Sequence, residues 1–139
     1  MDFLNDATYV DQAERIIKDL SRPIERNGKF IKPTLVSMSK IRNILSMAAD
    51  IYDEALRENS TKLNPELTAR IEYLRVRMIY EVGRESVNRN GQPTKDFFEK
   101  THLIEYTKMI GDDKAKLKLF YHYMEALIAY YKYNGAPEN

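Results

Sequence analysis

Two histidines, His102 and His122, are the first residues in the sequence to suggest catalysis or metal binding. Glu99 precedes His102 by three residues, which is half of the paired Glu-x-x-His pattern of di-iron bundles, but no second pair is present. The chain has no cysteine, glycine-rich phosphate loop, Gly-x-Ser-x-Gly elbow or His-Glu-x-x-His pair. The sequence therefore favours structural histidines in a protein that is not an enzyme and has no cofactor or bound metal. The alternative is a small metal-dependent enzyme that uses His102 or His122.

Positive charge is concentrated in residues 22–43, although the net charge of the whole chain is only +1. The segment has Glu25 as its one acidic residue, and its cations are Arg22, Arg26, Lys29, Lys32, Lys40 and Arg42. Such a segment can contact phosphates through its charges and through free N–H groups at the start of the helix that follows. The alternative is a solubilising loop, because charge runs are commonly just solvated.

Arginine and tyrosine recur together further along the chain. Arg70, Arg77 and Arg84 are seven residues apart, so on a helix they form one stripe, which also contains Tyr73 and Tyr80. This pattern suits single-stranded nucleic acid, because guanidinium groups bind phosphates and aromatic rings stack on bases. The alternative is a structural role in intrahelical ion pairs with three nearby glutamates, Glu66, Glu81 and Glu85. Glu66 and Glu81 lie three or four residues from these arginines, the spacing of such pairs, and Glu85 adjoins Arg84.

The elements that would position these residues are helices, because apolar residues recur every three or four positions between the few glycines and prolines. We predict an all-α protein: a compact bundle of about five helices without strands, in one helical domain over residues 1–139. The predicted helices run from Asp6 to Leu20, from after Ser37 to Glu58, from Asn64-Pro65 to Val87, from Thr94 to Gly111, and from Asp112 or Asp113 to Asn134. Asp6 and Thr94 are the expected N-caps of the first and fourth helices, and Asn90 begins the break between the third and fourth. Residues 22–36 form the longest connection, part of which we expect to be mobile.

The composition indicates a soluble cytoplasmic protein. With 43% hydrophobic and 31% charged residues, the chain can bury a core of its own. The absence of cysteine fits a reducing compartment, and we see neither a signal peptide nor an apolar run near the roughly 18 residues of a membrane span. A net charge of +1 gives no global attraction for nucleic acid, so a polyanion must meet a local basic patch.

Three blocks of sequence, together with residues 9–14, resemble the small subunit of the type III-A CRISPR effector, the Csm complex. They are Ser37 to Leu45, Tyr73 to Arg84 and Tyr123 to Tyr133. Each block alone is a generic helix, so the resemblance rests on their order and spacing over essentially the whole chain. It implies a compact, non-catalytic helical subunit that stacks in several copies along a guide-RNA filament, contacts the target RNA mainly through its backbone, and adjoins the other subunits of the effector.

The resemblance implies RNA contacts from six cations. They are Lys40, Arg42, Arg75, Arg77, Arg84 and Lys132. For Arg84 the alternative is a buried structural arginine, because buried arginine is usually paired and Glu81 is close in sequence. Tyr131 stands where the family often has a histidine. The implied partners are guide RNA, target RNA, other effector subunits and further copies of the chain; the rival function is a generic helical interaction module whose basic segment docks an acidic protein.

Overall fold

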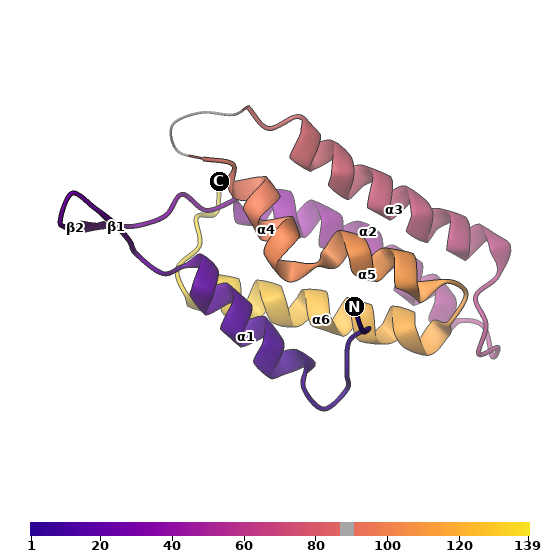
Figure 1. Cartoon of the computed structure of the whole chain (residues 1–139). Helices are drawn as coiled ribbons and strands as arrows, with labels where there is room; N and C mark the ends of the chain where they lie inside the picture. Colours follow the sequence, from indigo (N-terminus) through magenta and orange to yellow (C-terminus); the bar gives the residue numbers. More distant parts are fainter. Residues whose placement is uncertain (87–90) are drawn as a thin grey trace.

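The computed structural model describes residues 1–86 and 91–139, and it confirms a compact, mostly helical fold. In chain order the elements are α1 (Tyr9–Leu20), β1 (Ile24–Arg26), β2 (Lys29–Ile31), α2 (Met38–Leu56), α3 (Pro65–Gly83), α4 (Pro93–Thr101), α5 (Leu103–Ile110) and α6 (Lys114–Tyr133) (Figure 1). Two differences from the prediction stand out in the described residues: the fourth predicted helix is two helices, and the first connection contains two strands.

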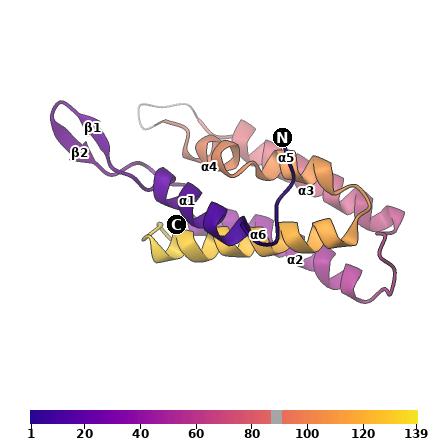
Figure 2. The ribbon, with the colours of Figure 1, turned by 60° about the horizontal axis from the view of Figure 1, so that its bottom comes forward.

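The helices form two layers. α1, α2 and α6 make one layer, and α3, α4 and α5 make the other, as the turned view shows (Figure 2). α2 and α3 pack side by side and run in opposite directions, and α6 packs against α2 and also runs opposite to it (Figure 1). The start of α2 therefore lies at the same end of the bundle as the ends of α3 and α6.

Apolar stripes at helical spacing build the core between these layers. The stripe of α2 is buried at Met38, Ile41, Ile44, Ala48, Ile51 and Ala55. The stripe of α6 is buried at Leu117, Phe120, Tyr123, Met124, Leu127 and Tyr131, with Tyr121 and Ile128 partly buried beside it. Each large side chain buried in this way contributes about 1.5–3 kcal/mol to folding. Across the described residues, no helix has both the length and the apolar character needed to cross a membrane.

Helix caps explain where several elements begin. The Asn64 side chain accepts a hydrogen bond from the Leu67 N–H at 2.9 Å, and Asp113 caps α6, so these two helices begin where the sequence predicts. The predicted caps Asp6 and Thr94 are wrong, because α1 begins after Thr8 and α4 begins at Pro93. The carboxylate of Glu85 takes the role expected of Thr94, since it accepts hydrogen bonds from the N–H groups of Thr94 and Lys95 at 2.8 and 3.4 Å.

The third predicted helix ends at Gly83 rather than near Val87. Glu85 lies just beyond this end, and its carboxylate caps α4. Val87, the predicted end of the helix, and Asn90, where the predicted break begins, lie outside the described residues.

The fourth predicted helix is split at His102, whose backbone is left-handed with φ of 58°. A non-glycine residue in this conformation costs about 1–2 kcal/mol, so other contacts must hold it. One such contact is the buried hydroxyl of Tyr123, which donates to the carbonyl of Thr101 at 2.8 Å. The break lets α4 pack against α1 while α5 packs against α6.

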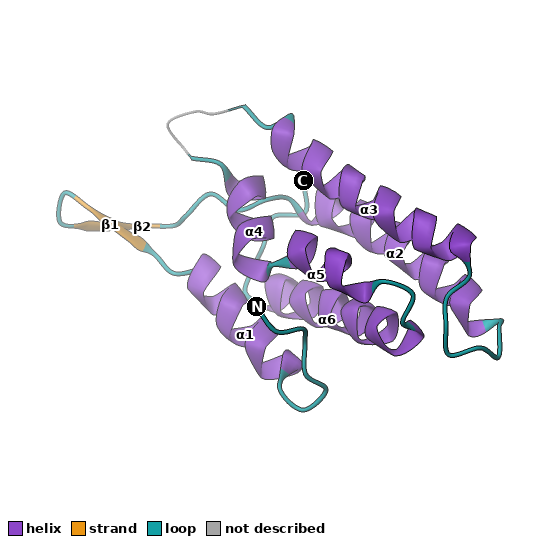
Figure 3. Cartoon of the chain, turned by 45° about the vertical axis from the view of Figure 1, so that its right-hand side comes forward, coloured by secondary structure: helices purple, strands orange, loops and turns teal. Residues whose placement is uncertain are grey.

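The prediction of no strand is wrong for the connection between α1 and α2. β1 and β2 pair antiparallel and project from the bundle as a hairpin (Figure 3). Its turn consists of Asn27 and Gly28, which both have positive φ, 52° and 76°. A two-residue turn with both φ values positive matches the twist of paired strands, which is why Asn-Gly is the favoured sequence for it.

We predict that Tyr131→Phe destabilises the protein. The buried Tyr131 hydroxyl donates to the Val36 carbonyl at 2.6 Å and so ties the end of the connection to α6. Its loss leaves a buried carbonyl unpaired, and we expect the free energy of unfolding in urea to fall by about 1–3 kcal/mol. The matched control is Tyr133→Phe. The Tyr133 side chain is 86% exposed, so loss of its hydroxyl should leave the free energy of unfolding unchanged. Equal stability of the two variants would contradict this role for Tyr131.

Candidate nucleic-acid interface

Most of the predicted RNA-binding cations meet at one end of the bundle. We call this the basic end: the start of α2 with Lys40 and Arg42, the last turns of α3 with Arg77 and Arg84, and the end of α6 with Lys132 (Figure 1). Lys40 also reaches α4, where its Nζ donates to the Thr94 Oγ1 at 3.4 Å. Arg75, the sixth predicted residue, lies nearer the middle of α3, about 13 Å before Arg84 and about 3 Å before Arg77 along the helix axis.

The C-terminal segment brings a carboxylate between two of these cations. The Arg42 guanidinium donates to both carboxylate oxygens of Glu138, at 2.7 and 3.4 Å, and Lys132 lies 3.9 Å from the same group. The hydrogen bond and charge of Arg42, with the charge of Lys132, hold the pKa of Glu138 below its ordinary value. Two cations and one carboxylate leave this cluster with a net positive charge, and all three side chains are exposed.

The same segment occupies the first N–H groups of α2. The N–H groups of Met38 and Ser39 donate to the carbonyls of Pro137 and Glu138 at 2.8 and 3.1 Å. The next N–H, that of Lys40, donates to the hydroxyl of Ser37 at 3.4 Å. The expectation that this helix start offers free N–H groups to a phosphate is therefore wrong, and charge alone remains available there.

A second carboxylate lies between the two arginines of α3. Glu81 is buried, and it accepts from the Nε of Arg84 at 3.0 Å and lies 3.6 Å from the Nη2 of Arg77. Here too two cations outnumber one carboxylate. The Arg84 side chain is 54% exposed, so the alternative of a buried structural arginine is wrong, although the predicted pairing with Glu81 is present.

Aromatic rings accompany the cations of α3. Tyr73 and Tyr80 are exposed, as the proposed stacking on bases requires, and the Arg77 guanidinium lies 5.3 Å from the centre of the Tyr80 ring. Arg75 differs from its neighbours, because it is paired with Glu72 and its side chain is only 20% exposed. It therefore presents less of its side chain to a partner than Arg42, Arg77, Arg84 or Lys132 does.

The histidines lie apart from each other and from the basic end. His102 is exposed at the junction of α4 and α5, where it lies 4.0 Å from Glu105, and His122 contacts the rings of Tyr52 and Tyr121. No group of three or more histidine, cysteine, aspartate or glutamate side chains in residues 1–86 and 91–139 has a geometry that could hold a metal ion. Each histidine thus has a local structural environment.

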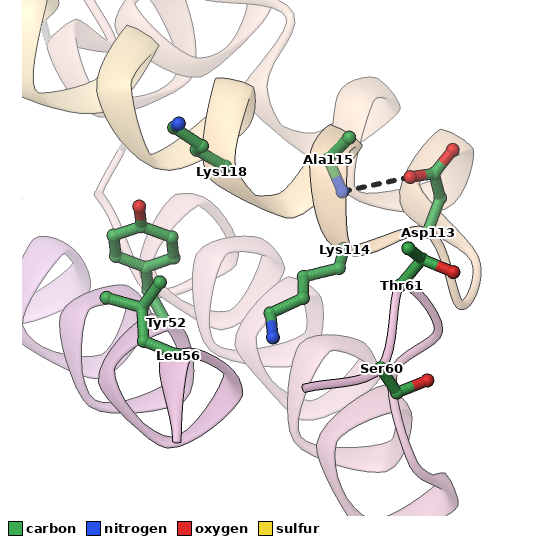
Figure 4. A pocket seen from close by; sticks show the side chains of 8 residues that line it. All are labelled: Tyr52, Leu56, Ser60, Thr61, Asp113, Lys114, Ala115 and Lys118. Atoms are coloured by element: carbon green, nitrogen blue, oxygen red, sulfur yellow. Dashed lines mark hydrogen bonds between the residues drawn. The ribbon is translucent and has the colours of Figure 1, made fainter. Parts of the chain in front are cut away.

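A pocket of about 280 Å³ lies at the opposite end of the bundle (Figure 4). Tyr52 and Leu56 form one wall, and the start of α6 forms the other. Two of its polar groups serve the fold: Asp113 accepts from the Ala115 N–H at 2.9 Å, and Lys114 donates to the carbonyl of Glu58. These contacts close the junction between the α2–α3 loop and α6.

Sequence reasoning missed two features of this end of the molecule. The cations Arg26 and Lys29 lie on the hairpin, and the sequence signal that could have placed them is Asn27-Gly28 between two short strand-like runs. The contact of Glu138 with Arg42 joins residues 96 positions apart, and no local pattern predicts it.

Comparisons with known proteins agree on one family. A family model described as Csm2 Type III-A matches residues 14–136. The chain is similar to the CRISPR system Cms protein Csm2 of Streptococcus thermophilus, with 37% identity over 99% of this chain and 100% of the relative. The protein of that name from Mycobacterium tuberculosis is 38% identical over 90% of each chain, and that from Enterococcus italicus is 28% identical over 87% and 85%.

We predict that Arg42→Ala raises the pKa of Glu138 toward its ordinary value, because the Arg42 hydrogen bond is the largest cause of its lowering. The contact of Glu138 with Arg42 should be at full strength above the ordinary carboxyl pKa and weaken as the pH falls through the lowered one. NMR titration of the Glu138 side chain measures its pKa and the pH range over which the contact weakens. Arg57→Ala, which removes an arginine from the far end of α2, is the control and should leave this titration unchanged. An unmoved midpoint in Arg42→Ala would be evidence against the contact.

Proposed function

The chain belongs to the Csm2 family of type III-A CRISPR systems, as a small subunit of the Csm complex, and from this premise we propose that it supports guide and target RNA through contacts with the RNA backbone. The observation that carries the proposal is the basic end. Helix ends that are far apart in sequence lie at one end of the bundle, and their sequences carry cations, among them Lys40, Arg42 and Arg84. A sugar-phosphate strand is the partner whose repeated charge fits several such groups at once.

The ion pairs of the basic end are compatible with phosphate binding. The exposed pairs of Glu138 are worth about 0–1 kcal/mol, so a phosphate can replace that carboxylate at modest cost. Glu81 is buried, so Arg77 and Arg84 would meet a phosphate while still paired with it. Glu138 and Glu81 each lie beside two cations, so one positive charge remains at each cluster even while the ion pairs persist. The exposed ring of Tyr80 beside Arg77, and that of Tyr73 nearer the middle of α3, add surfaces on which unpaired bases can stack whatever their sequence.

The near-neutral chain fits a supporting role. In a guided complex, base pairing reads the sequence, so a subunit beside the duplex needs to recognise only backbone shape and charge. The net charge of +1 keeps the affinity of one free subunit for RNA low and sensitive to salt. Several copies aligned along the guide RNA add their patches through effective concentration, without a strong site on any of them.

The proposal gives this chain no catalytic step. The two histidines, which were the residues best suited to one, lie on separate elements within structural contacts. We predict that the double variant His102→Ala/His122→Ala retains the nuclease activity of the reconstituted Csm complex within about twofold. Loss of that activity, with assembly and folding intact, would support the metal-dependent enzyme instead.

We predict that Lys40→Ala/Arg42→Ala/Arg77→Ala weakens binding of single-stranded RNA on the order of tenfold at low salt. Loss of three phosphate contacts should also reduce the slope of log affinity against log salt by about 2. Fluorescence anisotropy at several salt concentrations measures both quantities. The control, Arg57→Ala/Lys62→Ala/Lys108→Ala, removes the same charge from the opposite end and should bind RNA like the wild type. Equal binding by both triple variants would favour the module that docks an acidic protein.

A further inference from the structure

The hairpin stands apart from the packed bundle. All six residues of β1 and β2 are exposed, and among the described residues neither strand packs against a helix (Figure 3). Isolated two-stranded hairpins are marginally stable in water, so the residues on this one are not explained by a contribution to the core. Their arrangement requires another physical reason.

Two cations face each other at the tip of the hairpin. Arg26 pairs with Lys29 across the strands, directly beside the turn. Side chains alternate between faces, so the next pair, Glu25 and Phe30, lies on the opposite face. Within the part of the chain that the structure describes, no carboxylate lies within 4.0 Å of Arg26, Lys29 or Lys32.

This pairing works against the hairpin when nothing is bound. Like charges directly opposite each other on one face destabilise paired strands, and an already marginal hairpin has little stability to lose. An anion between the two side chains would convert this repulsion into two favourable contacts. The Asn27-Gly28 turn holds both cations in place, because its backbone geometry fixes the register of the strands.

We propose that Arg26 and Lys29 form a phosphate-binding site, through which the hairpin holds an RNA strand that passes the basic end. The site rests on the proposed function and adds a second point of contact to it. It differs from the clusters at Glu81 and Glu138, because its cations have no carboxylate to displace in the described structure.

The position of the hairpin favours RNA over an acidic protein. β2 leads through residues 32–37 into the start of α2, where Lys40 and Arg42 lie, so hairpin and basic end are consecutive in the chain. Lys32, at the base of the hairpin, adds a cation between them. An RNA backbone carries evenly repeated negative charge, so one strand can contact the hairpin and the basic end at the same time.

The test compares two double variants of the full-length chain in binding single-stranded RNA. Arg26→Gln/Lys29→Gln removes the site, and Arg57→Gln/Lys62→Gln removes the same charge at the far end of the bundle. We expect the hairpin variant to bind about three- to tenfold more weakly and to lower the salt slope by about 1.4, because two phosphate contacts are lost. The far-end variant should match the wild type. Thermal unfolding of the hairpin variant should also match it, since the hairpin does not pack on the bundle.

Other outcomes overturn the inference. If the hairpin variant binds RNA like the wild type while Lys40→Ala/Arg42→Ala/Arg77→Ala binds weakly, the hairpin site is wrong and the proposed function stands. If the wild-type chain binds no RNA at low salt, both are wrong. If the hairpin variant keeps full RNA affinity but fails to join the reconstituted Csm complex, the hairpin binds another protein subunit instead.

Discussion

The direction in which three helices must run to bury their apolar stripes determines the rest of this structure. α2 packs between α3 and α6, and both of these run opposite to it. That arrangement brings the start of α2 to the ends of α3 and α6, so residues such as Arg42, Arg84 and Lys132 share one end of the molecule. None of these cations is part of the core, but the packing of the core brings the helix ends that carry them to one end of the bundle.

Several cations at this end are paired with carboxylates, which they outnumber. Glu138 and Glu81 each lie between two cations, and the tail that carries Glu138 also satisfies the first N–H groups of α2. The contacts of Glu138 are exposed and weak enough for a phosphate to replace, whereas those of the buried Glu81 hold Arg77 and Arg84 in place. The hairpin differs, because Arg26 and Lys29 face each other at the edge of the molecule with no carboxylate partner in the described structure.

The sequence predicts the features of this protein that depend on local chemistry. Apolar periodicity identifies the helices, and Asn64 before Pro65 correctly marks the start of α3. The break between α4 and α5 at His102 could not be predicted in this way, because no glycine or proline marks it in the sequence. The hairpin could have been predicted from Asn27-Gly28, which favours a two-residue hairpin turn, although the charged residues around it are also typical of a loop. For the site, residue types and spacing identified the cations, whereas the carboxylate of Glu138 depends on a contact between chain segments that only the folded structure brings together.

The most direct test of the RNA-supporting role is amide hydrogen exchange of this subunit within the assembled Csm complex, before and after target RNA is added. The account predicts slower exchange on RNA binding in residues 24–42 and at the ends of α3 and α6, with little change in the α2–α3 loop and the start of α6. Protection confined to that loop and the start of α6, with the basic end unchanged, would contradict it.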